Sequence, residues 1–134
     1  MSEVTPPTRP TVLVVDDEED LRDIMRRMLE RRGFDVLLAG DAESAIATCR
    51  DHAGTIYVLL TDLGLPGASG GELSQAVAGL RPGIRIVYVS GLPKDIAVTK
   101  GLVGPDALLV QKPFTADQLL GALHSVLGRR APAV

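Results

Sequence analysis

Four short apolar runs of this sequence each end in residues that could take part in chemistry. The runs cover residues 11–15, 56–61, 84–89 and 108–111, and the residues that follow them are Asp16 with Asp17, Asp62, Ser90 with Gly91, and Lys112 with Pro113. In an open α/β sheet, ligands bind at the carboxyl ends of the strands. Acids, a hydroxyl and an amine at four strand ends therefore predict one shared site.

The acids in this set predict a site for a hard divalent cation. If the strands are ordered 2-1-3-4-5, the first and third are neighbours about 4.8 Å apart, which brings Asp16, Asp17 and Asp62 together. Such close carboxylates repel unless they are neutralised, and oxygen ligands in an open site suit Mg²⁺. A carboxylate beside Mg²⁺ and the Lys112 ammonium can attack phosphorus and hold an acyl phosphate, with Ser90 donating a hydrogen bond.

The elements that must position these residues follow from the alternation of apolar runs with amphipathic segments. This alternation predicts an α/β fold, a flavodoxin-like, doubly wound, five-stranded parallel sheet of order 2-1-3-4-5 with five helices. Strands are expected at 11–16, 34–39, 57–62, 84–90 and 107–111, and helices at 19–32, 42–52, 70–80, 94–101 and 116–128.

Several helix ends are marked by local sequence. Gly33 is expected to end the first helix, Asp41 to cap the second, and residues 69–72 and 115–118 to form capping boxes. The first helix should bury one stripe made of Leu21, Ile24, Met25, Met28 and Leu29. The fourth helix is rich in β-branched residues and is followed by glycines, so we expect it to be short and the most mobile.

Composition bounds the class of protein. The 134 residues, 46% of them apolar, predict one folded domain at 11–128, with a flexible lead-in at 1–10 and a tail at 129–134. No run is long enough for a membrane span and no secretory signal opens the chain. The lone Cys49 fits a reducing cytoplasm. A net charge of −3 without a basic stripe argues against a nucleic-acid partner.

The ordered residues resemble the receiver domain of bacterial two-component response regulators. The matching segments are Val14-Val15-Asp16-Asp17, Leu60-Thr61-Asp62, Val89-Ser90-Gly91 and Gln111-Lys112-Pro113-Phe114, with the loop 65–70 after Asp62. The resemblance covers about residues 11–128. It implies a phosphoprotein of two-component signalling that takes a phosphoryl group from a histidine kinase or a histidine phosphotransfer protein.

The resemblance also implies a role for each matching residue. Asp62 would be the phosphorylation site, and Mg²⁺ would be held by Asp16, Asp17, Asp62 and the backbone carbonyl of Gly64. Ser90 and Lys112 would contact the phosphoryl group, the peptide bond to Pro113 would be cis, and Gly91 and position 109 would belong to the switch. Receivers commonly carry Tyr or Phe three residues before the lysine, whereas this chain has Leu109.

Other interpretations of these residues and of the function remain open. The acids at 16–20 could also stabilise the N-terminus of the first helix through its dipole. A haloacid-dehalogenase-type aspartate phosphatase would use similar groups but needs an Asp-x-Asp nucleophile in its first strand, and a flavodoxin-like cofactor binder would need an anion-attracting first loop. An adaptor with a decayed site would not keep every charged position. We expect a signalling domain and not an enzyme, either stand-alone or as the terminal receiver of a hybrid sensor histidine kinase.

Overall fold

A computed structural model describes residues 9–128 as one parallel sheet of order β2-β1-β3-β4-β5 with five helices. The strands are β1 (Thr11–Val15), β2 (Asp35–Ala39), β3 (Val58–Asp62), β4 (Arg85–Ser90) and β5 (Leu108–Gln111). The helices are α1 (Glu19–Arg31), α2 (Ala42–Asp51), α3 (Gly70–Leu80), α4 (Lys94–Thr99) and α5 (Ala116–Val126). The fold class, the strand order and the number of helices are as the sequence predicts. The predicted lead-in and tail fall largely outside the described residues.

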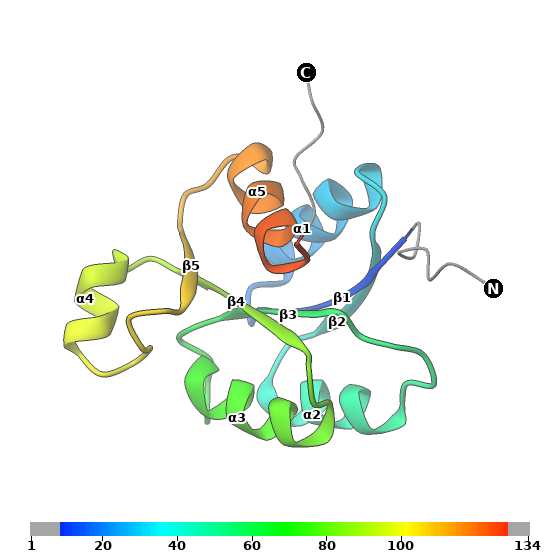
Figure 1. Ribbon diagram of the computed structural model, residues 1–134, viewed down its shortest axis with the longest axis horizontal. Coiled ribbons are helices and arrows are strands. Elements are labelled where there is room, and N and C mark those ends of the chain that lie inside the picture. The colour runs from blue at the N-terminus through cyan, green and yellow to red at the C-terminus, as the bar shows by residue number, and fades with distance from the viewer. Residues whose placement is uncertain (1–8, 129–134) are drawn as a thin grey trace.

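The helices cover the sheet in two layers (Figure 1). α1 and α5 lie on one face, α2 and α3 lie on the other, and α4 lies beyond the β5 edge. Alternate residues of β1 point to opposite faces of the sheet. Val12 and Val14 pack under α1 and α5, whereas Leu13 and Val15 pack under α2 and α3. Burial on both faces is why the central strands read as continuous apolar runs.

Helix ends follow the local signals closely. Gly33 has a φ of 92°, and the Phe34 N–H behind it donates to the Leu29 carbonyl, which closes α1. The Asp41 carboxylate accepts from the Ser44 N–H at 2.7 Å, as predicted for the start of α2. Thr115 forms a full capping box with Gln118.

Three details of the prediction are wrong, and most other predicted element bounds differ from the structure by one or two residues, as at α5, which ends at Val126 and not at 128. Ile24 does not belong to the buried stripe of α1, because it is 46% exposed; α1 packs over β1 and β2 near the sheet edge, and this contact is too narrow to cover the whole stripe. The Ser69 hydroxyl accepts from the Glu72 N–H, but the Ser69 N–H donates no hydrogen bond to the Glu72 carboxylate, so α3 carries half of a capping box. α4 ends at Thr99, two residues before Gly101, whose φ of 73° cannot continue a helix.

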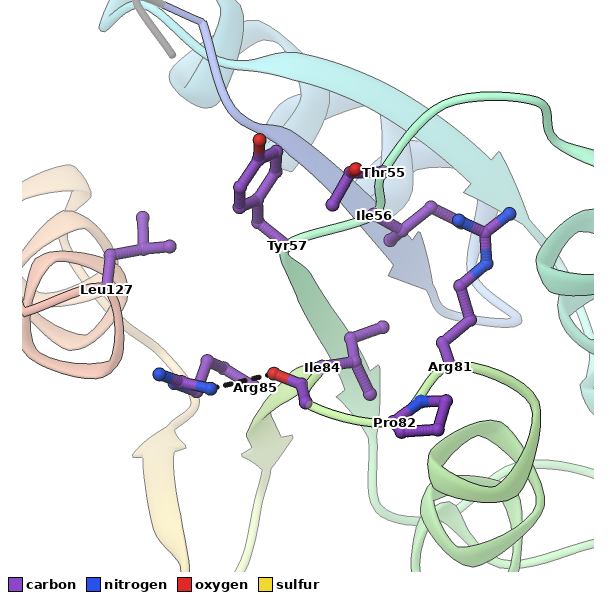
Figure 2. Close-up of a pocket in the computed structure, with 9 residues that line it drawn as sticks. Thr55, Ile56, Tyr57, Arg81, Pro82, Ile84, Arg85 and Leu127 are labelled. Atoms are coloured by element: carbon purple, nitrogen blue, oxygen red, sulfur yellow. Dashed lines mark hydrogen bonds between the residues drawn. The ribbon is translucent and has the colours of Figure 1, made fainter. Parts of the chain in front are cut away.

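The edge of the sheet where the strands begin is held by two arginines. Arg81 donates to three carbonyls of the α2–β3 connection, those of Cys49, His52 and Gly54. Arg85, the first residue of β4, donates to the Val126 carbonyl at the end of α5. Both arginines line a cavity of about 430 Å³ at this edge (Figure 2).

Both ends of the described chain lie at this same edge. The Pro10 carbonyl, just before β1, accepts from the N–H of Asp35, where β2 begins, and α5 ends against Arg85. Within residues 9–128, no helix has the length and apolar character to cross a bilayer.

Candidate functional site

Strand register brings the predicted site residues to the carboxyl edge of the sheet. Val15 of β1 is level with Thr61 of β3, so the next residues, Asp16 and Asp62, are neighbours. The Lys112 N–H donates to the Ser90 carbonyl at 2.7 Å, which fixes the ends of β4 and β5 beside each other. The edge therefore holds two acidic strand ends, a hydroxyl and an amine together, as the sequence predicts.

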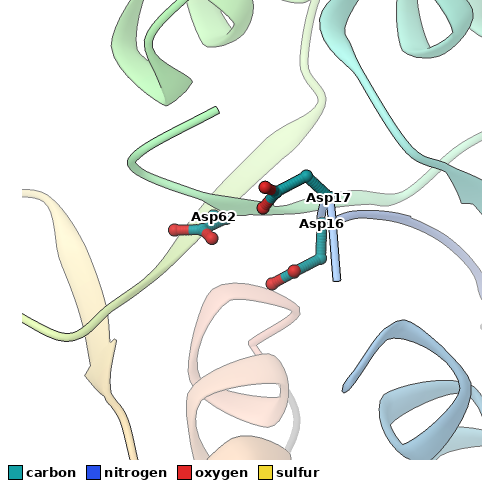
Figure 3. Close-up of side chains that lie close together, drawn as sticks. All are labelled: Asp16, Asp17 and Asp62. Atoms are coloured by element: carbon teal, nitrogen blue, oxygen red, sulfur yellow. The ribbon is translucent and has the colours of Figure 1, made fainter. Parts of the chain in front are cut away.

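Three carboxylates form the centre of the site (Figure 3). One oxygen from each of Asp16, Asp17 and Asp62 lies within 4.8 Å of the others. Asp16 is fully buried, Asp62 is partly buried and Asp17 is exposed, so the cluster opens toward solvent on one side. Oxygen donors with one wet side are the arrangement that suits a cation that keeps several of its waters.

Asp16 is the most buried charge of the site. One of its carboxylate oxygens accepts from the Glu18 N–H at 2.8 Å, and the other lies 3.4 Å from the Lys112 ammonium. Burial raises the pKa of Asp16, and the hydrogen bond from Glu18 and the charge of Lys112 only partly offset that effect. The buried carboxylate is therefore costly to ionise without a further positive charge nearby.

Lys112 is the positive counterpart of these acids. Its ammonium lies 3.0 Å from the Asp62 carboxylate as well as 3.4 Å from Asp16. Burial acts to lower the pKa of Lys112, but the hydrogen bond and charge of Asp62, together with Asp16, outweigh it, and the pKa is raised. The lysine thus stays cationic at the acidic edge, and its peptide bond to Pro113 is cis, as the resemblance implies.

Asp62 sits at the mouth of a cavity. Its second oxygen accepts from the Gly64 N–H at 3.1 Å. A cavity of about 620 Å³ opens beside it, and its lining includes Ser90 and the apolar side chains of Leu65, Leu92 and Leu102. The carboxylate is therefore reachable by an external group, with Lys112 already in contact with it.

Ser90 is nearly buried, and its hydroxyl oxygen accepts from the Leu92 N–H at 2.9 Å. The hydroxyl proton takes no part in this bond, so it is available to a group that arrives beside Asp62. Gly91 follows at the surface, where an added Cβ would meet nothing within 4 Å. Flexibility at position 91 is therefore not limited by packing.

Leu109, which stands where receivers commonly have Tyr or Phe, has an aromatic neighbour in Tyr88 that the sequence analysis did not predict. Leu109 is level with Tyr88 on β4, and both side chains pack in the cluster that includes Leu63 and Val103. The Tyr88 hydroxyl pairs with Ser74 of α3 at 2.7 Å in a buried position. The sequence did contain a signal for this contact. Tyr88 lies two positions before Ser90, and alternate residues of a strand share a face, so an aromatic side chain could be expected beneath the switch hydroxyl.

A comparison with known protein families shows which family this chain belongs to. Residues 12–124 match the response regulator receiver domain family. The chain belongs to this family.

Relatives and solved structures agree with this membership. The chain is 35% identical over 122 residues to the sensory transduction protein RegX3 of Mycolicibacterium smegmatis, which covers 90% of this chain and 52% of that protein. The chain thus spans about half the length of such curated relatives. Among solved structures, it is similar to a response regulator receiver protein from Sinorhizobium medicae, with 27% identity, a TM-score of 0.77, and 90% and 95% of the two chains covered. The receiver domain of the hybrid histidine kinase CckA gives 27% identity and a TM-score of 0.73, covering 87% of this receiver and 98% of that chain.

Proposed function

We propose that this receiver takes a phosphoryl group from a phosphohistidine donor onto Asp62 and changes conformation in response. The observation that carries the proposal is the Lys112 ammonium, 3.0 Å from Asp62 and 3.4 Å from Asp16, at the edge of a three-carboxylate cluster. A carboxylate flanked by one fixed cation and by ligands for a second is arranged to accept a transferred phosphoryl group.

The residues present fit Mg²⁺. Three carboxylates share a small volume, and among residues 9–128 only Lys112 forms ion pairs with them, which leaves negative charge for a hard cation to balance. Asp17, Asp62 and the Gly64 carbonyl would hold the ion, with Asp16 acting through water. Bound there, the ion supplies positive charge to the phosphoryl oxygens during transfer.

The chain's own residues have separate tasks in the transfer. An Asp62 oxygen forms the new bond to phosphorus while the phosphorus–nitrogen bond of the donor histidine breaks, and the imidazole leaves with that electron pair. Lys112 stabilises the charge that develops on the phosphoryl oxygens. Ser90 donates its free hydroxyl proton to one of them, while its oxygen can keep the hydrogen bond from the Leu92 N–H.

Acetyl phosphate provides the test. Wild type incubated with acetyl phosphate and Mg²⁺ should gain the mass of one phosphoryl group, and Asp62→Asn should gain none while keeping its fold. Asp106→Asn, a change at an exposed acid elsewhere, should label like wild type. Undiminished labelling of Asp62→Asn would reject the assignment, as would normal labelling in excess chelator.

Two settings for the receiver follow from its relatives. RegX3 and the transcriptional regulatory protein AruR of Pseudomonas aeruginosa favour a regulator whose receiver controls an output domain, whereas the CckA structure favours the receiver of a hybrid histidine kinase. In both settings we propose a cytoplasmic signalling role with a kinase or phosphotransfer partner. The receiver would perform no metabolic reaction, and any contact with DNA would belong to a different domain.

A further inference from the structure

One side chain outside the predicted set contacts the loop that carries the acidic pair. Arg22 lies in the second turn of α1, where its N–H donates to the Glu18 carbonyl. Its guanidinium turns back toward the strand ends, and Nη1 donates to the backbone carbonyl of Asp16 at 2.8 Å. The contact is to the main chain of Asp16 and not to its carboxylate.

That carbonyl belongs to the peptide unit that joins Asp16 to Asp17. A peptide unit is planar, so holding its carbonyl also sets the direction in which the next residue leaves the chain. The Asp16 carboxylate has its own anchors in Glu18 and Lys112. The Asp17 carboxylate accepts no hydrogen bond from any residue in 9–128, so its placement depends on the backbone before it.

Gly40 provides the space that the guanidinium occupies. A Cβ at position 40 would lie 3.0 Å from Arg22 Nη1, closer than ordinary van der Waals contact. Gly40 is not among the glycines with positive φ, so its backbone conformation does not require glycine. A side chain at position 40 would therefore have to share this space with the guanidinium and would shift it.

We infer that Arg22, seated against Gly40, is a positioning residue that aims Asp17 at the cation site. This inference rests on the proposed function, because it assigns Arg22 to the same carboxylate cluster. The rival explanation is that Arg22 only lowers the negative charge of the cluster. The two explanations predict opposite signs: loss of a positioning contact weakens Mg²⁺ binding, whereas loss of a positive charge strengthens it.

Calorimetric titration with Mg²⁺ separates these explanations. Arg22→Met should weaken Mg²⁺ binding on the order of tenfold, the usual scale for losing a group that orients a ligand. Arg22→Lys keeps a donor on a long chain and should fall between wild type and Arg22→Met. Arg26→Met removes the same charge one turn further along α1, where Arg26 pairs with Asp23 and Glu30, and should leave the affinity unchanged.

Gly40→Val tests geometry with every charge kept. The added side chain should push the guanidinium away from Asp16 and weaken Mg²⁺ binding in the same direction as Arg22→Met. In the double variant the two losses should not add, because both remove one contact. Unchanged or tighter binding in Arg22→Met, or fully additive losses, would overturn the inference. If Arg22→Met does not fold, Arg22→Lys and Gly40→Val decide between the two explanations.

Labelling with acetyl phosphate distinguishes this inference from the proposed function. Arg22→Met should need more Mg²⁺ for half-maximal labelling but reach the wild-type rate at saturating Mg²⁺. A wild-type protein that binds Mg²⁺ yet is never phosphorylated would reject the proposed function and leave the affinity comparison intact. A wild-type protein that is phosphorylated, with Arg22→Met unaffected in its Mg²⁺ dependence, would reject only the role of Arg22.

Discussion

Leu92 is an apolar residue close to the Asp62 carboxylate. It lines the cavity beside the carboxylate, as does Gly64, which has no side chain. Neither residue carries a polar side chain that could orient a water molecule toward a phosphoryl group on Asp62. The phosphoryl group on Asp62 should therefore be lost slowly.

Replacing Leu92 by Glu should shorten the lifetime of the phosphorylated state. A carboxylate at this position can hold and polarise the attacking water, and we expect on the order of tenfold faster decay, about 1.4 kcal/mol in the barrier. Phosphate release from pre-labelled protein measures it. Leu92→Met keeps a similar apolar volume and should decay like wild type. Decay of the Glu variant that is equal to or slower than wild type would contradict this account.

At the scale of elements, α2 depends on a charged cap. The Ser44 N–H donates to the Asp41 carboxylate, and this backbone hydrogen bond lowers the pKa of Asp41 below its ordinary value of 3.8. A lowered pKa in the folded state means that the charged cap adds stability above pH 4 and that this stability is lost as the pH falls through the lowered pKa.

Asp41→Asn should reveal this dependence, because asparagine caps without titrating. Wild type should exceed the variant in unfolding free energy at pH 7, and the difference should shrink below about pH 4. Urea unfolding between pH 3 and 7 measures it. Thr115→Asn changes a cap without removing an ionisable group and should show no such pH-dependent difference. A difference for Asp41→Asn that is constant across the range would reject a charged cap.

The segment 91–105 is the element where a switch would act. α4 is short, it buries only Ala97, and Gly101 and Gly104 interrupt the chain behind it. Tyr88, by contrast, is tied to α3 through Ser74, so the aromatic ring beneath this segment is fixed. Leu109 is too short to take the place of the Tyr or Phe that other receivers carry at this position, so we expect the response in segment 91–105, which we predict to be the least stable.

Beryllofluoride, a stable mimic of the phosphoryl group, should therefore slow amide exchange across 91–105 while Leu109 keeps its rotamer. Leu109→Ala should lose packing stability yet retain this protection. Amides of α2 (Ala42–Asp51) serve as the internal reference and should not change. Unaltered exchange across 91–105, or loss of the response in Leu109→Ala, would show that the signal takes another route.

At the scale of the whole molecule, the features that depend on the periodicity of apolar residues could be predicted from the sequence. The sheet, its order and the meeting of Asp16, Asp62, Ser90 and Lys112 follow from apolar runs that end in functional residues. Contacts that depend on long side chains were not foreseen. Arg22 reaches back to the Asp16 carbonyl and Tyr88 reaches across to α3, and no sequence spacing encodes either distance. The predicted burial of Ile24 was wrong because the periodicity of apolar residues locates the centre of the buried face of a helix but not how wide that face is.

The placement of Pro10 and Val126 in the fold has a practical consequence. Pro10 and Val126 both lie at the sheet edge where the strands begin, and the carboxylates lie at the opposite edge. A fluorescent reporter attached beside Pro10 or Val126 would therefore leave the approach to Asp62 open. Either position could carry a fused reporter without covering the carboxylates at the opposite edge.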